Sequence, residues 1–299
     1  GGVLGVVLVV LAFLLAAALM IRFRVFDSPL LRPASGRRVW IPIGIGVAIS
    51  LILGAVTFGH PTDMVNFSSW ALHAGKVGLP NFYISGMWAD YPPGYIYVLY
   101  VIGLIGNLFQ LQVGSVGLNL LIKLPSILCD AACGYFIYRL ARKSLGERNA
   151  VRLCAFYVLN PLILFNSAVW GQMDGVLALL TALMLYAYLQ EKKPLCAVFF
   201  VLGVLVKPQM LMFGPIMLVA FLRDVVHRPK QELLATLYSI LAGAATLVLV
   251  ALPFTLKQNP LWLWEKYAGA AGLYPYATVN AFNLYALVGA NWAPDTGIF

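Results

Sequence analysis

The number of membrane crossings depends on residues 90–111, which read DYPPGYIYVLYVIGLIGNLFQL. Their apolar part, residues 95–111, approaches the length that crosses a bilayer, since a core of about 30 Å needs about 20 helical residues. It follows two prolines, however, contains glycines, and is interrupted by Asn107 and Gln110. We therefore predict a juxtamembrane or re-entrant helix that returns to its own side, as is tolerated where such a piece packs on protein.

The composition indicates a membrane protein. Of the 299 residues, 62% are hydrophobic and 10% are charged, whereas soluble domains carry about 25% charged residues. The net charge of +9 comes from Lys and Arg in short loops between apolar runs, which indicate membrane orientation and not a nucleic-acid partner. We expect an all-α, polytopic fold with a single transmembrane domain over residues 1–299. The four cysteines lie in apolar runs and are interpreted as small core residues: Cys129, Cys133, Cys154 and Cys196.

The basic loops set the topology. Residues 22–38 and 139–152 are rich in Arg, so the positive-inside rule places both in the cytoplasm. An even number of crossings must separate them, which is why one of three apolar candidates there, 95–111, is predicted not to cross. Eight spans remain, at residues 3–21, 40–58, 120–138, 153–168, 176–189, 195–206, 210–222 and 233–254.

Two long segments then lie on the outer face. Residues 58–119 form an outer loop with juxtamembrane helices, and residues 255–299 form an aromatic-rich segment with short helical pieces. The chain begins at Gly1 without a basic region, so residues 3–21 make a poor signal peptide and we expect them to form a spanning helix. Phe299 closes no predicted element, and we expect the sequence to be truncated there.

The predicted topology collects the unusual polar residues on the outer side, although only Lys and Arg were used to derive it. Ionisable groups at membrane depth are costly and usually functional. The candidate site residues are His60, Asp63, Asp90, Tyr91, Tyr95, Trp170, Gln172, Asp174, Lys207, Gln209, Tyr276, Asn280 and Asn283.

The three acids each have an alternative interpretation. Asp63 follows Pro61-Thr62 and could cap a helix or take a proton from a hydroxyl. Asp174 could cap the helix that follows it. Asp90 lies on a corner stiffened by two prolines, or simply precedes a helix with an aromatic belt.

Lys207 stands beside Pro208 in an otherwise apolar hairpin. A buried ammonium needs an anion, and we favour a lipid phosphate at headgroup depth over an internal pair with one of the outer-face acids. Aromatic faces and amide side chains suit sugars. Acids, a Lys and aromatics around an outer-leaflet pocket therefore suggest sugar transfer from a lipid carrier.

Several motifs also resemble a known family. They are an acid after an early span, DYPPGY at 90–95, KLPS at 123–126, SAVWGQMD at 167–174, KPQ at 207–209 and NAFN at 280–283. Over roughly residues 40–290 the chain resembles the polytopic GT-C glycosyltransferases. It looks most like bacterial mannosyltransferases related to the second GPI mannosyltransferase, and more loosely like the ER glucosyltransferases that extend lipid-linked oligosaccharides.

The resemblance implies an integral enzyme of a bacterial cytoplasmic membrane with its site on the outer face. It would move a hexose, mannose or glucose, from a polyprenyl-phosphate sugar to a hydroxyl of a glycan, lipid-linked or protein acceptor, with inversion. Asp63 would be the general base and Lys207 would stabilise the leaving phosphate. Asp63-Met64-Val65 lacks the second acid of a paired motif, so we expect no divalent metal and no cofactor. The alternatives are a carrier that flips lipid-linked sugars and a non-catalytic lipid-binding protein.

Overall fold

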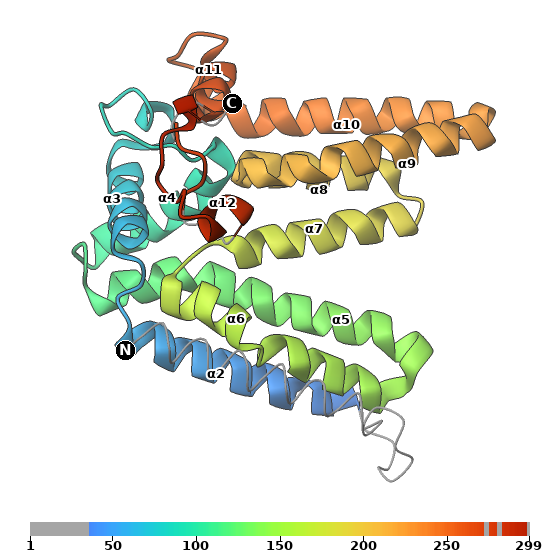
Figure 1. The fold of residues 1–299 in the computed structure, drawn as a ribbon, viewed down its shortest axis with the longest axis horizontal. Coiled ribbons are helices and arrows are strands. Elements are labelled where there is room, and N and C mark those ends of the chain that lie inside the picture. The colour runs from blue at the N-terminus through green and yellow to red at the C-terminus, as the bar shows by residue number, and fades with distance from the viewer. Residues whose placement is uncertain (1–35, 272–274, 280–282, 298–299) are drawn as a thin grey trace.

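The computed structural model describes residues 36–271, 275–279 and 283–297. These residues fold into helices, and their only extended pairings are isolated bridges such as that of Tyr276 with Pro294. The long helices run side by side (Figure 1): α2 (Trp40–Val56), α5 (Val116–Val158), α7 (Asp174–Leu189), α8 (Lys193–Val206), α9 (Gly214–His227) and α10 (Pro229–Thr255). The predicted span at residues 3–21 lies outside the described residues.

The helix lengths confirm the all-α membrane class. Among the described residues, four segments are long and apolar enough to cross a membrane: Gly36–Val56, Val116–Val158, Pro208–His227 and Pro229–Thr255. Four shorter apolar segments accompany them, at Pro93–Leu108, Pro161–Trp170, Asp174–Leu189 and Lys193–Val206. The count of eight spans stays a prediction.

Two further helices, α3 (Pro61–Val77) and α4 (Pro93–Leu108), pack together at one end of the long helices (Figure 1). The 16 residues of α4 extend over about 24 Å at the helical rise, less than the bilayer core. Gly103 allows the two helices to approach closely. A Cβ atom at this position would overlap the carbonyl oxygen of Ala71. That residues 95–111 do not cross the membrane stays a prediction, because α7 and α8, which are predicted spans, are no longer than α4.

The predicted inner loop at residues 139–152 is helical. Only Gly146 departs from helical geometry, with φ 74° and ψ 165°, and there α5 turns back on itself. The returning part ends at Val158, before the predicted span does, and is followed by α6 (Pro161–Leu164) and the π-helical turn η4 (Phe165–Trp170). Single π-helical turns occur frequently at functional sites.

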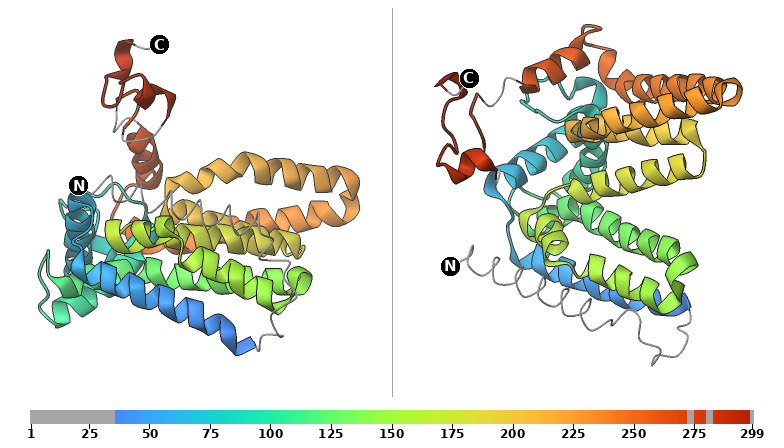
Figure 2. Two further views of the ribbon diagram at one scale, coloured as in Figure 1. Left: turned by 60° about the horizontal axis from the view of Figure 1, so that its bottom comes forward. Right: turned by 45° about the vertical axis from the view of Figure 1, so that its right-hand side comes forward.

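Short elements complete the chain. They are the 3₁₀ turns η2 (Gly36–Val39), η3 (Leu79–Asn81), η5 (Pro208–Phe213) and η6 (Asp295–Gly297), and the helices α11 (Trp262–Ala271) and α12 (Leu284–Leu287). Helical pieces in the outer segment were expected. Residues 283–297 lie apart from the long helices (Figure 2).

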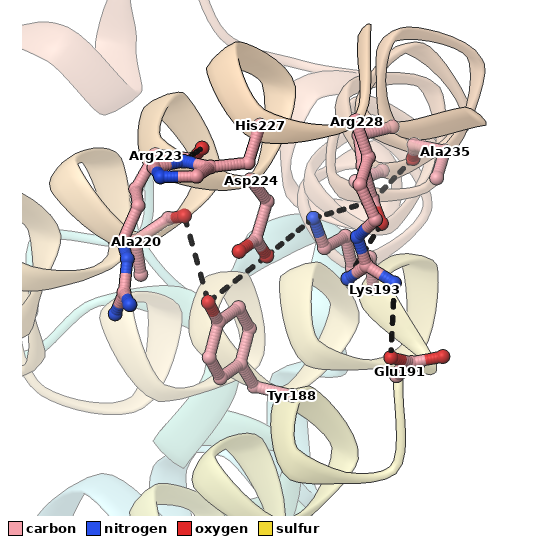
Figure 3. Close-up of polar contacts among 11 residues, drawn as sticks. Tyr188, Glu191, Lys193, Ala220, Arg223, Asp224, His227, Arg228 and Ala235 are labelled. Carbon is pink, nitrogen blue, oxygen red and sulfur yellow. Dashed lines mark hydrogen bonds and ion pairs between the residues drawn. The ribbon is translucent and has the colours of Figure 1, made fainter. Parts of the chain in front are cut away.

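A polar network joins α7, α8, α9 and α10 at the end away from α3 and α4 (Figure 3). The ammonium of Lys193 lies 2.6 Å from Asp224 and 2.5 Å from Glu232. Arg228 pairs with Glu232 over 2.9 Å, and the hydroxyl of Tyr188 donates to Asp224 over 3.0 Å. Lys193 lies between the predicted spans at residues 176–189 and 195–206, and the structure buries and pairs it.

Candidate functional site

Asp63 lies in the first turn of α3 with its carboxylate held by two donors. Its Oδ2 accepts from Nε1 of Trp170 over 2.8 Å and from Nε2 of Gln172 over 2.7 Å. The N-cap of α3 is His60, and no side chain caps that helix. The interpretation of Asp63 as a helix cap is therefore wrong. Its side chain keeps 26% of its surface exposed, so the carboxylate is held and reachable.

The chain brings these groups together by joining the α2–α3 connection to the turn after η4. The ring of His60 stacks on that of Trp170, with centroids 5.0 Å apart and planes 11° apart. The backbone N–H of His60 also donates to the carbonyl of Trp170 over 2.8 Å. Gly59 permits the approach, because its φ is +103° and a Cβ there would lie 2.7 Å from the same carbonyl. His60 Nδ1 lies 3.4 Å from Asp63 Oδ2 and thus flanks the carboxylate.

Gln172 connects Asp63 to the rest of the site. Its Oε1 lies 3.5 Å from the hydroxyl of Tyr91 and 3.5 Å from the ammonium of Lys207. Burial, with Tyr95 and Asp174 nearby, raises the pKa of Tyr91 well above its ordinary value, so its hydroxyl stays a neutral donor. Tyr95 is buried, packs its ring against Tyr91, and has a hydroxyl without a protein partner.

Lys207 is paired with Asp174. Its ammonium lies 2.5 Å from Oδ1, and Oδ2 of the same carboxylate accepts from Asn166 over 3.1 Å. No side chain caps α7, whose N-cap is Met173, so the interpretation of Asp174 as a helix cap is wrong. For Lys207 the structure has the internal pair, which was the alternative to the lipid phosphate that we favoured.

Asp90 lies in the connection between η3 and α4, next to Ala89, which lines a hollow. Burial raises the pKa of Asp90. Its own backbone hydrogen bond and the charge of Lys266 act in the opposite direction. The ammonium of Lys266 donates to the carbonyl of Ala89 over 2.5 Å and lies 4.3 Å from the ring centre of Tyr83. The hollow has a volume of about 400 Å³ and is lined by polar and aromatic side chains that include Tyr83, Trp88, Gln258, Asn259, Glu265 and Lys266.

Three predicted residues lie outside this network. Gln209 is exposed on η5. Tyr276 packs its ring against Trp292 over 5.2 Å, and Asn283 caps α12 through Ala286. Asn280 lies outside the described residues. The structure thus gathers Asp63, His60, Trp170, Gln172, Tyr91, Lys207 and Asp174, with Tyr95 and Asp90 beside them.

Two polar residues of the site region were not among the predictions, Lys123 and Asp130. Both are buried in α5, with 0% and 7% of their surfaces exposed. Asp130 lines a cavity of about 240 Å³ together with Tyr157, Asn166 and Asp174. Their signal in the sequence was available, because a charge inside an apolar span is costly and usually functional.

Metal binding is untested by the geometry. Within the part of the chain that the structure describes, no three His, Cys, Asp or Glu side chains are grouped to hold an ion. The absence of a divalent metal stays a prediction.

Comparison with known families identifies a match over more than half of the chain. Residues 92–256, 165 of the 299, match the family described as dolichyl-phosphate-mannose-protein mannosyltransferase. A search of curated proteins gives no match. The matched region contains Trp170, Gln172, Asp174 and Lys207 and begins after Asp63.

Proposed function

The chain belongs to the dolichyl-phosphate-mannose-protein mannosyltransferase family of GT-C glycosyltransferases, and from this we propose that it transfers mannose or glucose to an acceptor hydroxyl with inversion, Asp63 acting as general base. As a member it is a membrane glycosyltransferase that uses a polyprenyl-phosphate-sugar donor. The observation that carries the proposal is the Asp63 carboxylate, which two N–H donors orient beside Lys207.

The reaction is a single displacement. The acceptor hydroxyl gives its proton to Asp63 while its oxygen attacks the anomeric carbon of the donor sugar. The bond from that carbon to the phosphate oxygen breaks, and the electron pair leaves with the polyprenyl phosphate. Attack opposite the leaving group inverts the anomeric centre. The indole of Trp170 and the amide of Gln172 both donate to Oδ2 of Asp63. The other carboxylate oxygen, Oδ1, therefore remains to receive the proton.

Lys207 supports departure of the phosphate. A phosphate needs no general acid, but the charge it develops is stabilised by a cation held in place beforehand. The side chain of Lys207 is 13% exposed and lies next to Gln172, the ligand of Asp63. The amide of Gln172 therefore contacts the base, Asp63, through its nitrogen and the cation, Lys207, through its oxygen.

The lipid tail of the donor has an apolar groove available. This groove, of about 700 Å³, runs between α8 and α10 and reaches α11; its lining includes Phe200, Leu205, Leu247, Leu263 and Tyr267. One of its lining residues, Leu205, precedes Lys207 by two positions. We place the prenyl chain in this groove because its phosphate would then reach the Lys207 ammonium.

The acceptor would enter from the hollow beyond Asp90. Trp88 exposes 55% of its surface there, and amides and an acid surround it. An aromatic face with a few convergent polar groups suits a hydroxyl-bearing acceptor. On the predicted topology this entrance lies on the outer face of the membrane, which in a bacterium is the outer side of the cytoplasmic membrane.

The test is Asp63→Asn, which keeps the shape and an oxygen that can accept from Trp170 and Gln172. We expect transfer from polyprenyl-phosphate-mannose to membrane extract to fall by about 10²- to 10⁴-fold, the usual contribution of a general base, with donor binding intact. Asp295→Asn, the same change in η6 apart from the site, is the control. Full retention of transfer by Asp63→Asn would rule out the base, and movement of lipid-linked sugar across vesicles by either variant without transfer would favour a carrier.

A further inference from the structure

Lys123 carries a buried charge that the proposed reaction does not use. Its side chain is fully buried, and its ammonium donates to the carbonyl of Gly54 over 3.1 Å, to the carbonyl of Thr57 over 2.7 Å and to Oγ1 of Thr57 over 3.2 Å. An ammonium has three hydrogens and no acceptor, so these three oxygens match it fully. Among the described residues no Asp or Glu forms an ion pair with it.

The counter-charge is the end of a helix. Gly54 and Thr57 belong to the last turn and C-cap of α2, where backbone carbonyls lack helical partners and the helix dipole concentrates partial negative charge. The carbonyl of Leu53 accepts twice from Thr57, from its backbone N–H over 3.0 Å and from its Oγ1 over 2.6 Å. Burial of a charge costs several kcal/mol unless it is compensated, so Lys123 and the end of α2 depend on each other.

The same ammonium lies between the two segments that form the Asp63 site. Thr57 begins the connection that leads through Gly59 and His60 to Asp63. On the other side, a Cβ on Gly171 would lie 3.3 Å from Cε of Lys123, so the lysine stem packs against the turn that presents Trp170 and Gln172.

We propose that Lys123 is a positioning residue, which fixes the α2–α3 connection against the Trp170–Gly171 turn and thereby holds Asp63 Oδ2 between its two donors. It acts through Asp63 and touches no substrate. The inference rests on the proposed function, in which Asp63 takes the proton of the acceptor.

The alternative is that Lys123 only stabilises the fold, and a double-mutant cycle separates the two. Lys123→Met removes the three donors, and Lys123→Arg retains charge and donors. We expect Lys123→Met to lower kcat by about 10- to 100-fold, as the loss of one charged hydrogen-bonding group would, with the KM for polyprenyl-phosphate-mannose changed less than twofold. Lys123→Arg should recover part of kcat. The control, Thr57→Val, removes the hydroxyl, which accepts from Lys123 and donates to Leu53, but keeps both carbonyls that accept from the ammonium, and should cost less than Lys123→Met.

The decisive variant is Lys123→Met combined with Asp63→Asn. If Lys123 acts through Asp63, the double variant is no slower than Asp63→Asn alone. Losses that multiply, an unchanged kcat in Lys123→Met, or a parallel loss of kcat, donor binding and thermal stability overturn the proposal. If Lys123→Met does not fold, Lys123→Gln is measured by the same cycle. Wild-type transfer by Asp63→Asn would instead refute the base, so the two failures are distinguishable.

Discussion

Gln172→Glu tests the ionisation of Asp63 without changing the shape of the site. Nε2 of Gln172 lies 2.7 Å from Oδ2 of Asp63, and the substitution replaces this donor by a negatively charged oxygen. Two charges about 4 Å apart repel by about 4 kcal/mol at an effective dielectric of about 20, equivalent to about three pH units. Lys207, 3.5 Å from Oε1 of Gln172, cancels part of this repulsion. We expect a shift of about one to three pH units.

The direction follows from which form the base needs. A neighbouring negative charge favours the protonated carboxyl, whereas proton removal from the acceptor needs the carboxylate. The acid limb of the pH–rate profile therefore moves to higher pH, so the variant loses transfer at a higher pH than the wild type does and regains it as the pH rises. The assay is the initial rate of transfer from polyprenyl-phosphate-mannose across a pH series. Gln172→Met, the control, removes the hydrogen bond without adding charge and should slow transfer while moving the limb less than Gln172→Glu does. Coincident acid limbs in Gln172→Glu and the wild type, at equal donor binding, would refute a rate governed by Asp63.

The remaining predictions concern three lysines. Lys207→Met removes a charged donor worth about 1.5–3 kcal/mol, so the KM for the polyprenyl-phosphate donor should rise about 10- to 100-fold; an unchanged donor saturation curve would contradict the phosphate role. Lys193→Met removes the buried ammonium that Asp224 and Glu232 share, leaving Glu232 to Arg228 and Asp224 to Tyr188, and should cost about 3–5 kcal/mol of unfolding free energy, part of which Glu232→Leu in the same chain restores; equal denaturation midpoints for Lys193→Met and the wild type would count against the network. Burial lowers the pKa of Lys266 from 10.5 to about 8, with Asp90 opposing the shift. Between those values the unfolded chain binds the proton that the native chain has lost, so stability rises with pH, and thermal melts of Lys266→Gln at matched pH should lack that rise.

The fold class could be predicted because membrane helices follow from apolar length alone. The two basic loops also require an even number of crossings between them, which led to the prediction that one apolar segment does not cross. The glycines and the preceding prolines of α4, which are local properties of the sequence, indicated that it is this segment. The turn at Gly146 could not be predicted in the same way. Whether RLARKSLGERNAVR is helical depends on how α5 packs against its own returning part and against α2. An excess of Lys and Arg indicates the side of the membrane on which a segment lies, but not whether the segment is coil or helix.

The site shows a similar division. The polar residues were found because each is costly near a bilayer, but their roles depended on partners far away in the sequence. Asp63 and Asp174 both occupy places where helix capping is common, yet each carboxylate points to another element. Tyr276 and Asn283 had the same composition signal as the residues of the network, and only the path of the chain separates them from it. Lys123, a charge inside a long apolar run, carries the same signal, but its role depends on the end of α2, 66 residues away in the sequence.

Lys207 shows how two interpretations that were opposed in the sequence fit one mechanism. Without a donor, an unpaired ammonium at headgroup depth would be costly, and Asp174 compensates it. Asp174 itself keeps 42% of its side chain exposed and has a second partner in Asn166, so it remains solvated and hydrogen-bonded if the ammonium turns away. On the proposed mechanism, the arriving phosphate therefore exchanges with Asp174 as the anion beside Lys207, and the charge stays compensated before and after binding. The internal pair then describes the empty site, and the lipid phosphate describes the loaded one.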